Sequence, residues 1–260
     1  MNSISMPVAG APETIQPGDL QITWLIARRG AVESLRDRTT LTMSAIFALL
    51  LPVLMVLLVI RPQAGQTGAK ADEALGLLMA TYLLVAGLLP SSGAASVASG
   101  LFAGEMEQGN LAPLLATPAS NRAIFGGKVL GAVLPSLIYS LIAVTSYLIE
   151  LAVLVGPARL RLLPPALSLV MVALVPVYAV LGATVASLVS SRVRTYQSAQ
   201  MVSSLVLLPV MTVLIGLAFA MRQWGALPLM LTVVGLIALA VVLILLAAAT
   251  WRREEMMARR

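Results

Sequence analysis

Long apolar stretches separated by short polar segments make up most of the chain. Six of them have about 20 residues or more, the length that an α-helix needs to cross the hydrocarbon core of a bilayer. The predicted spans are residues 41–60, 74–103, 125–155, 165–190, 199–221 and 227–251. The second span is longer than a crossing requires, so we expect it to tilt or to protrude. The pattern predicts an all-α integral membrane protein with six transmembrane helices.

The segments at the two ends of the chain differ in character. Residues 1–19 are rich in Pro, Gly and Ser and contain no apolar core, which predicts a flexible cytoplasmic tail. Residues 20–38 mix apolar side chains with arginines, and Trp24 is placed to lie at the level of the lipid headgroups. They predict an amphipathic interfacial helix, with a solvated basic linker as the alternative. Residues 252–260 form a short basic cytoplasmic tail.

The polar segment between the second and third spans, residues 104–128, is neither a membrane span nor a simple turn. It is acidic at its start, at Glu105 and Glu107, and basic at its end, at Arg122 and Lys128. Gly109 is followed by an asparagine, and this pair supplies a turn and then an N-cap for a helix.

A short apolar stripe follows this turn. Leu111, Leu114 and Leu115 recur at helical spacing. The helix should close at Thr117, because the residue before Pro118 is pushed out of the helical region. The segment therefore predicts a short amphipathic helix beside the membrane. Such a helix has little of its own chain to bury itself against, so we expect it to dock on another protein.

Composition limits the chemistry that the chain can perform. Hydrophobic residues make up 59% and charged residues only 11% of the sequence, so we expect residues 39–251 to form one membrane domain with no separate soluble domain. Cysteine and histidine are both absent. This excludes thiol nucleophiles, disulfides, zinc sites and acid–base catalysis by histidine.

The distribution of positive charge predicts the orientation. With both termini inside, the inner segments hold twelve Lys and Arg residues and the outer loops hold five. Cytoplasmic loops of membrane proteins carry such an excess. We therefore expect a multi-pass protein of the cytoplasmic (inner) membrane, with both termini and the 104–128 segment in the cytoplasm. The net charge of +6 then reflects this rule, and no nucleic-acid partner is expected.

The predicted spans carry almost no charge. Glu150 is the exception, and it lies about 33 Å farther along a helix than Lys128, which places it near the outer interface. A proton- or sodium-coupled carrier is hard to build without a carboxylate at the midplane. Residues 126–128 superficially match a phosphate loop, but Val129 replaces the required Ser or Thr and Arg122 replaces the first glycine. The energy source is therefore expected on another chain.

Small residues form two stripes on the predicted spans. They are Ser92, Ser96, Gly100 and Gly104 in the second span, and Gly127 and Gly131 in the third. Small residues at this spacing let another helix approach closely. Two interpretations stay open, namely packing within one subunit and contact between two subunits.

Uncharged polar residues and methionines occur inside the spans. They are Thr81, Tyr82, Ser136, Tyr139, Ser140, Thr145, Met171, Tyr178, Thr184 and Met211. A wall of such groups can form weak hydrogen bonds and can reshape around an apolar body. For most of them, contacts between helices are the simpler interpretation, so the substrate path is not assigned.

The 104–128 segment carries a family resemblance. It contains Glu-x-Glu-x-Gly-x-Leu and then Leu-x-x-Thr-Pro-x-Ser, with a lysine farther on. Together with six spans and an N-terminal amphipathic helix, this pattern resembles the permease subunits of type-2 ABC exporters. The resemblance runs from about Trp24 over nearly the whole length. The matching positions are Glu105, Glu107, Gly109, Leu111, Leu114 or Leu115, Thr117, Pro118, Ser120 and Lys128.

The resemblance implies partners and a site. Members of that family place two permease subunits, identical or paired with a sibling, on two cytoplasmic ABC ATPase subunits. The segment after the second span forms a coupling helix that sits in a cleft of the ATPase. ATP and Mg then belong to the partner, so this chain needs no cofactor or metal of its own, and its other partners are membrane lipids. The residues implied to contact the ATPase are Glu105, Glu107, Gly109, Leu111, Leu114, Leu115, Thr117, Pro118, Arg122 and Lys128.

This chain departs from the family pattern in three places. The family often has Arg between the two glutamates and Thr after the glycine, where this chain has Met106 and Asn110. Asparagine can still cap a helix. Members also commonly fold re-entrant half-helices between the fifth and sixth spans, whereas the connection in this chain, around residues 222–228, is short. Pro209 and Gly216 are the positions that could break the fifth span to make a half-helix.

We expect a permease that moves an amphipathic or hydrophobic substrate by alternating access, driven by a separate ATPase. The alternative is a non-transporting membrane anchor or assembly factor that docks the same ATPase. A membrane-embedded enzyme is disfavoured, because only Ser, Thr and Lys chemistry is left and the two lysines, Lys70 and Lys128, are expected outside the spans.

Overall fold

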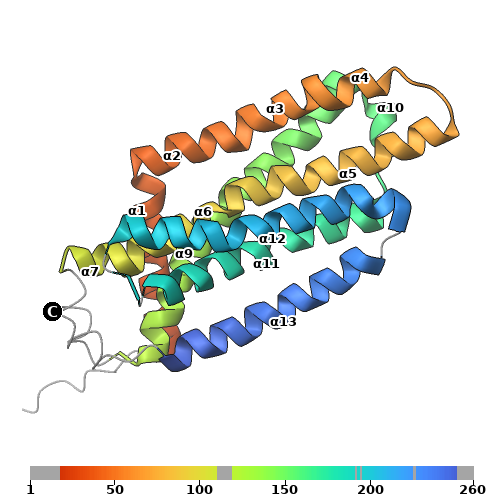
Figure 1. The fold of residues 1–260 in the computed structure, drawn as a ribbon. Coiled ribbons are helices and arrows are strands. Elements are labelled where there is room, and N and C mark those ends of the chain that lie inside the picture. The colour runs from red at the N-terminus through yellow and green to blue at the C-terminus, as the bar shows by residue number, and fades with distance from the viewer. Residues whose placement is uncertain (1–17, 110–118, 191, 194, 225–226, 251–260) are drawn as a thin grey trace, which may run out of the picture.

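The computed structural model describes residues 18–109, 119–190, 192–193, 195–224 and 227–250. These residues form helices and connecting turns, with no strand among them, which confirms the all-α class (Figure 1). Within this part of the chain, six helical rods are long and apolar enough to cross a membrane. A helix satisfies its backbone hydrogen bonds internally, which the bilayer core requires.

Several helical elements join end to end to make the first three spans. The first span contains α2 (Arg38–Ala45), the π-helical turn η1 (Ile46–Leu50), α3 (Leu51–Met55), the π-helical turn η2 (Val56–Ile60) and α4 (Arg61–Ala64). The second contains α5 (Ala69–Ser91), α6 (Gly93–Ser99), η3 (Gly100–Gly104) and α7 (Glu105–Glu107). The third contains α9 (Asn121–Glu150) and η4 (Leu151–Val155). A short helix, α10 (Pro157–Leu160), precedes α11 (Pro165–Ser190), α12 (Tyr196–Trp224) and α13 (Leu227–Thr250), which form the remaining spans.

These bounds confirm the six predicted spans and correct two of them. The second span continues to Glu107, and the third already begins at Asn121. With 39 residues, the second rod is about 58 Å long, nearly twice the thickness of the hydrocarbon core, so it protrudes as expected. The added turns belong to the 104–128 segment. Lys70 and Lys128, which were expected outside the spans, lie within the second and third helical rods.

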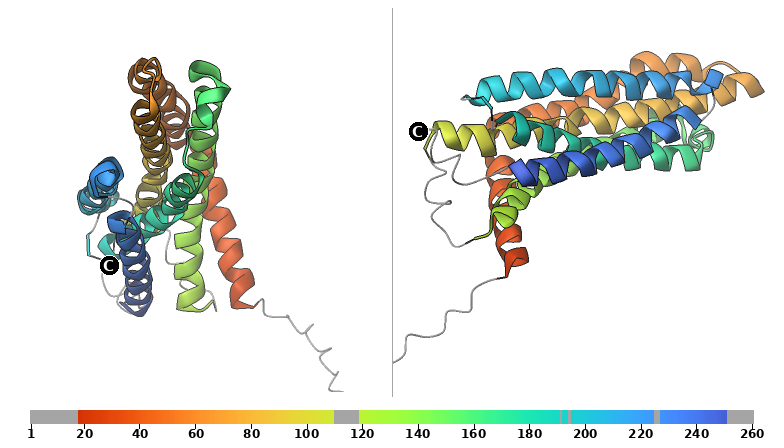
Figure 2. Two further views of the ribbon diagram at one scale, coloured as in Figure 1. Left: turned by 90° about the vertical axis from the view of Figure 1, so that its right-hand side faces the viewer. Right: turned by 60° about the horizontal axis from the view of Figure 1, so that its bottom comes forward.

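The N-terminal helix α1 (Asp19–Arg36) crosses one end of the bundle instead of running along it (Figure 2). The chain turns at Asp37, whose carboxylate accepts hydrogen bonds from the backbone N–H (2.9 Å) and the hydroxyl (2.6 Å) of Thr40 and so caps α2. Trp24 and Leu25 are exposed on α1, which suits a helix lying on a bilayer surface. The membrane position of α1 stays a prediction.

The second and fourth spans form the centre of the bundle. In the most apolar stretch of each span, 72% of the second and 61% of the fourth is buried, against 22% of the fifth and 11% of the sixth. The helices α5 and α6 pack against α9 and α11, whereas α12 and α13 lie at the outside (Figure 1). The outer faces of α12 and α13 are apolar and exposed, as expected of helices that contact lipid or another subunit.

Glycines let α9 approach α1 closely. A Cβ atom added to Gly127 would lie 2.7 Å from the Cβ of Ile26 and 2.8 Å from the carbonyl oxygen of Thr23. A Cβ on Gly131 would lie 3.2 Å from the carbonyl oxygen of Ala27. The small-residue stripe of the third span therefore packs within the subunit, against α1.

The stripe of the second span also has a partner within the subunit. The hydroxyls of Ser96 and Tyr196 lie 3.0 Å apart. A Cβ atom on Gly100 would meet the ring of Tyr196 at 3.8 Å, an ordinary van der Waals contact. These two members of the stripe face the start of α12, so the described contacts favour intramolecular packing here as well.

The fifth span is a single helix. It continues from Tyr196 to Trp224 through Pro209 and Gly216, so neither residue divides it into half-helices. At the end of α9, the carboxylate of Glu150 accepts a 2.6 Å hydrogen bond from the hydroxyl of Ser146. Glu150 is half-buried and lies at the opposite end of α9 from Lys128, as the sequence predicted.

Candidate functional site

Both ends of the 104–128 segment lie at the end of the bundle that α1 crosses (Figures 1 and 2). The structure describes residues 104–109 and 119–128 of this segment. The predicted docking face, formed by Leu111, Leu114 and Leu115 and closed by Thr117 and Pro118, lies outside the described residues. Its role stays a prediction, and the described part of the site consists of the two ends of the segment that flank this face.

The segment leaves the second span at a glycine. Gly109 has φ +73°, in the left-handed region where a side chain would be strained. Its N–H donates to the carbonyl oxygen of Met106 at 3.1 Å, which closes the last helical turn. A turn at Gly109 therefore ends the second span just after the two glutamates.

An internal ion pair joins the two ends of the segment. The ammonium of Lys128 donates to Oε2 of Glu105 at 2.6 Å and also to the carbonyl oxygen of Leu101. It lies 5.3 Å from the ring centroid of Phe102. The Lys128 side chain is 2% exposed and that of Glu105 is 25% exposed. A buried ammonium is costly without such partners, so the pair fixes α7 to α9.

This geometry changes the expectation for the charged residues of the site. In this structure the ammonium of Lys128 faces the interior between α7 and α9, and Glu105 is its partner. Glu107 and Arg122 are the charged positions of the predicted site that are exposed in the described part of the segment. A contact with the ATPase therefore stays a prediction. Glu107 and Arg122 are better placed for such a contact than Lys128 is.

Glu107 connects the segment to the fifth span. Its Oε2 accepts a 2.9 Å hydrogen bond from the backbone N–H of Tyr196, the first residue of α12. The first N–H groups of a helix lack partners within the helix, and a carboxylate there also meets the positive end of the helix dipole. The side chain of Tyr196 contacts Ser96, so the start of α12 is held by the second span at two points.

Ser120 connects the other end of the segment to α1. Its hydroxyl oxygen accepts from the backbone N–H of Ala123 at 3.1 Å and so caps α9. The same hydroxyl donates to Oδ2 of Asp19, in the first turn of α1, at 2.9 Å. The two ends of the segment are thus tied to α1, α9 and α12.

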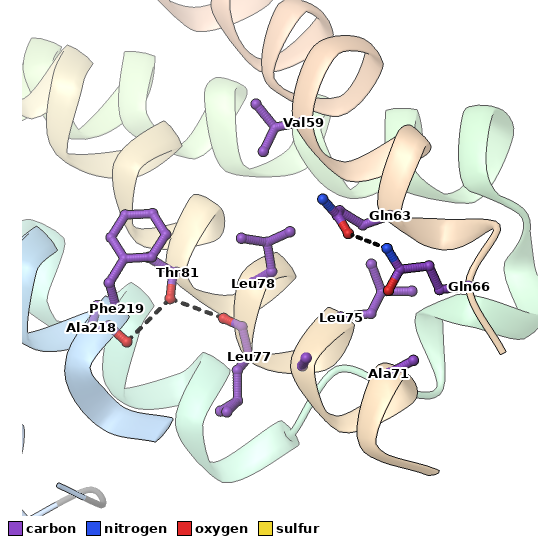
Figure 3. A pocket seen from close by; sticks show the side chains of 11 residues that line it. Val59, Gln63, Gln66, Ala71, Leu75, Leu77, Leu78, Thr81, Ala218 and Phe219 are labelled. Atoms are coloured by element: carbon purple, nitrogen blue, oxygen red, sulfur yellow. Dashed lines mark hydrogen bonds between the residues drawn. The ribbon is translucent and has the colours of Figure 1, made fainter. Parts of the chain in front are cut away.

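A cavity of about 300 Å³ lies at the opposite end of the bundle, between the first, second and fifth spans (Figure 3). Leu75 and Leu78 of α5 and Phe219 of α12 form apolar walls. None of the described residues that line it is charged. Its position is the outer end in the predicted orientation.

Polar groups stand on two sides of this cavity (Figure 3). On one side, the side-chain amide nitrogen of Gln66 donates to Oε1 of Gln63 at 2.9 Å. On the other, the hydroxyl of Thr81 donates to the carbonyl oxygen of Leu77 at 2.9 Å and lies 3.4 Å from that of Ala218. Neutral hydrogen-bonding groups beside apolar walls suit a neutral amphipathic ligand.

Several of the uncharged polar residues inside the spans form hydrogen bonds to backbone carbonyl oxygens, some within their own helix and some on a neighbouring helix. Thr81 lines the cavity. By contrast, the Ser140 hydroxyl donates to the carbonyl oxygen of Gly87 on α5 at 2.9 Å, and the Tyr178 hydroxyl lies 3.4 Å from that of Leu207 on α12. The simpler interpretation holds for Ser140 and Tyr178.

Sequence reasoning missed four residues of these sites. Asp19 and Tyr196 lie 101 and 89 positions from their partners Ser120 and Glu107, and no local pattern links residues so far apart. Gln63 and Gln66 left a weaker signal. Two amides three positions apart at the end of an apolar span lie on the same helical face. This spacing could have indicated a polar face from the sequence.

The fold and the site identify the chain as a multi-pass α-helical membrane protein in which a polar segment is attached to several spans. The profile of the family described as ABC-2 family transporter protein matches residues 24–226 of the 260. The chain belongs to this family and is a membrane permease of an ABC transporter. The family implies a cytoplasmic ATPase partner, and its members generally have no catalytic site of their own. No curated protein sequence matches the chain.

Proposed function

We propose that this permease exports an amphipathic or hydrophobic substrate across the cytoplasmic membrane by alternating access, driven by a separate ATPase. The observation that carries the proposal is the attachment of the 104–128 segment to α1, α9 and α12. A partner that moves this segment would move three helices together. ATP and Mg are then bound by the partner, and the permease supplies the path.

The docking role of the segment is tested by Leu114→Asp. Burying one leucine in an interface contributes about 1.5–3 kcal/mol, so an aspartate there should weaken the complex at least about tenfold. We expect the permease variant to insert normally but to lose its stimulation of ATP hydrolysis by the partner. Exposed rim charges should contribute less to the docking interface, about 0–1 kcal/mol each. Glu107 is a separate case, because it also holds the start of α12.

Gln197→Asp is the matched control for this experiment. Gln197 is exposed in the first turn of α12, outside the segment, and an acidic residue is favourable there. This variant should couple normally. Normal coupling of the Leu114→Asp permease, measured as ATP hydrolysis in a reconstituted complex, would remove the segment from the docking role.

The nature of the substrate is argued from the missing charge. A bare charge at the bilayer centre is costly, and the cavity of Figure 3 offers only neutral amides, a hydroxyl and apolar walls in its described lining. In vesicles that contain the permease and its ATPase, lipophilic compounds should stimulate ATP hydrolysis. Stimulation by small inorganic ions or free sugars alone would contradict an amphipathic substrate.

A non-transporting anchor that docks the same ATPase is the second candidate function, because it needs the same attachment of the segment. The two functions differ in the vesicle experiment. An anchor binds the ATPase but moves no compound into the vesicle lumen when ATP is added. We also propose that two permease subunits, identical or paired with a sibling, work together, since the exposed apolar faces of the fifth and sixth spans leave room for a second subunit.

A further inference from the structure

We propose that a groove between α9, α11 and α13 binds one anionic phospholipid of the cytoplasmic leaflet, with Arg122 holding the phosphate. The groove encloses about 590 Å³ and lies on the side of α9 that faces α13. Pockets of several hundred Å³ with apolar walls and few polar groups are typical ligand sites. This groove is separate from the cavity of Figure 3, with which it shares no lining residue.

The floor and the walls of the groove are apolar. Buried Phe125, Val129 and Val133 form successive turns of the floor on α9. Leu130 and Leu245 stand at the rim and are 42% and 65% exposed. Apolar side chains exposed at a groove on membrane-spanning helices meet acyl chains, so the hydrocarbon part of a lipid fits this surface.

The length of the groove matches one leaflet. From Arg122 to Val133 the groove follows α9 for about 16 Å at 1.5 Å per residue. Half of the hydrocarbon core of a bilayer is about 15 Å. Arg122 lies at the N-terminal end of α9, and the apolar floor of the groove continues from there toward the bilayer core. This is the order of charge and hydrocarbon in an anionic lipid.

The charge of Arg122 has no counter-ion in the described part of the chain. Arg122 is exposed, and neither ion pair found among the described residues involves it. The carboxylate of Asp19 accepts a hydrogen bond from Ser120, two positions before Arg122 in the chain. A cation in the first turn of a helix is also unfavourable, because that end carries the positive end of the helix dipole. A phosphate would compensate both the charge of the Arg122 side chain and the positive end of the helix dipole. Basic groups between helices on the cytoplasmic side bind lipid headgroups in this way.

The test measures lipid binding to the full-length permease by native mass spectrometry. The probes are phosphatidylglycerol and phosphatidylcholine with identical oleoyl chains. We expect the wild-type chain to retain one phosphatidylglycerol about fivefold more tightly than phosphatidylcholine, which corresponds to about 1 kcal/mol for one basic residue at the headgroup. Arg122→Gln should remove this preference, and Arg122→Lys should retain it.

Arg192→Gln is the matched control. Arg192 is an exposed arginine of the inner segments that does not line the groove. This variant should keep the fivefold preference. Val180→Phe, which fills the α11 side of the groove, should weaken the binding of both lipids. Loss of the preference in Arg192→Gln, or its persistence in Arg122→Gln, would overturn the proposal.

A second permease copy is the competing occupant of the groove. The chain has no cysteine, so Leu130→Cys gives a single thiol at the rim. In membranes this thiol should not be cross-linked to that of a second copy by a short bis-maleimide. Efficient cross-linking would show that protein covers the groove and would also overturn the proposal.

The inference rests on the proposed orientation only for the choice of leaflet. Lipid binding is measured without ATP or transport, so it can fail or succeed independently of the export function.

Discussion

At the scale of single residues, the ion pair between Lys128 and Glu105 shows how a charge is accommodated in this fold. The lysine is almost completely buried, whereas the glutamate keeps a quarter of its side-chain surface. The two partners therefore differ in how they respond to the loss of the other. A buried ammonium cannot recover its hydration, but a partly exposed carboxylate can.

Removing Glu105 should destabilise the permease more than removing Lys128. Glu105→Leu leaves the ammonium with only the carbonyl oxygen of Leu101 and the ring of Phe102, at an expected cost of about 3–5 kcal/mol. Lys128→Met leaves a carboxylate that water can reach, so its cost should be smaller. Thermal unfolding in detergent should show the larger loss for Glu105→Leu.

The double variant completes this cycle. Replacing both members of a buried ion pair by apolar residues is often neutral, because no uncompensated charge is left. Glu105→Leu combined with Lys128→Met should therefore unfold at a higher temperature than Glu105→Leu alone. A double variant that is less stable than both single variants would show that the pair acts through something other than charge compensation.

At the scale of elements, the contact between α1 and α9 depends on a backbone approach that only small residues permit. Gly127 lies against α1 with no room for a methyl group, whereas its neighbour Gly126 has room for one, since its added Cβ would be 3.7 Å from Cγ2 of Thr23. The two glycines are adjacent in the sequence and on the same helix. They differ only in the direction that they face.

Gly127→Ala should therefore separate α1 from α9, and Gly126→Ala should not. Overpacking of this kind costs about 1–3 kcal/mol. An alanine at Gly126 should be neutral or should stabilise the helix by up to about 1 kcal/mol. The measurements are thermal unfolding and the rate of proteolysis within α1. Equal behaviour of the two variants would contradict the close contact.

At the scale of the whole molecule, the six spans and the excess of basic residues on one side predict the orientation. The ends of the 104–128 segment, the start of α12 and α1 lie at one end of the bundle, and α4 and α10 lie at the other (Figure 1). A single labelling experiment therefore places every part of the molecule. It can use introduced cysteines because the chain has none.

Gly65→Cys should react with a membrane-impermeant maleimide in intact cells, and Gln108→Cys only after permeabilisation. Gly65 has open space around it and a negative φ, and Gln108 is exposed, so both tolerate a cysteine. Gly68 and Ser120 are poorer choices, because Gly68 has φ +125° and Ser120 caps α9. The reverse labelling pattern would invert the proposed orientation and place the docking segment outside the cell.

The sequence by itself determined the features that depend on local composition. The length of each apolar stretch defined the six spans, the turn at Gly109 required a glycine, and the pattern of the 104–128 segment indicated the family that the profile match confirms. These features are local because each depends on consecutive residues, either through the thickness of a bilayer or through backbone strain.

Only the tertiary structure decided which residues meet. It turned Lys128 inward to Glu105, attached Glu107 to the start of α12 and placed Gly127 against α1. It also placed Arg122 at the end of an apolar groove formed by three helices. In a membrane protein every span is apolar, so the hydrophobic pattern does not distinguish a central helix from a peripheral one. The neighbours of each helix are set by close packing and by a few polar contacts between distant residues, and a sequence does not display those contacts.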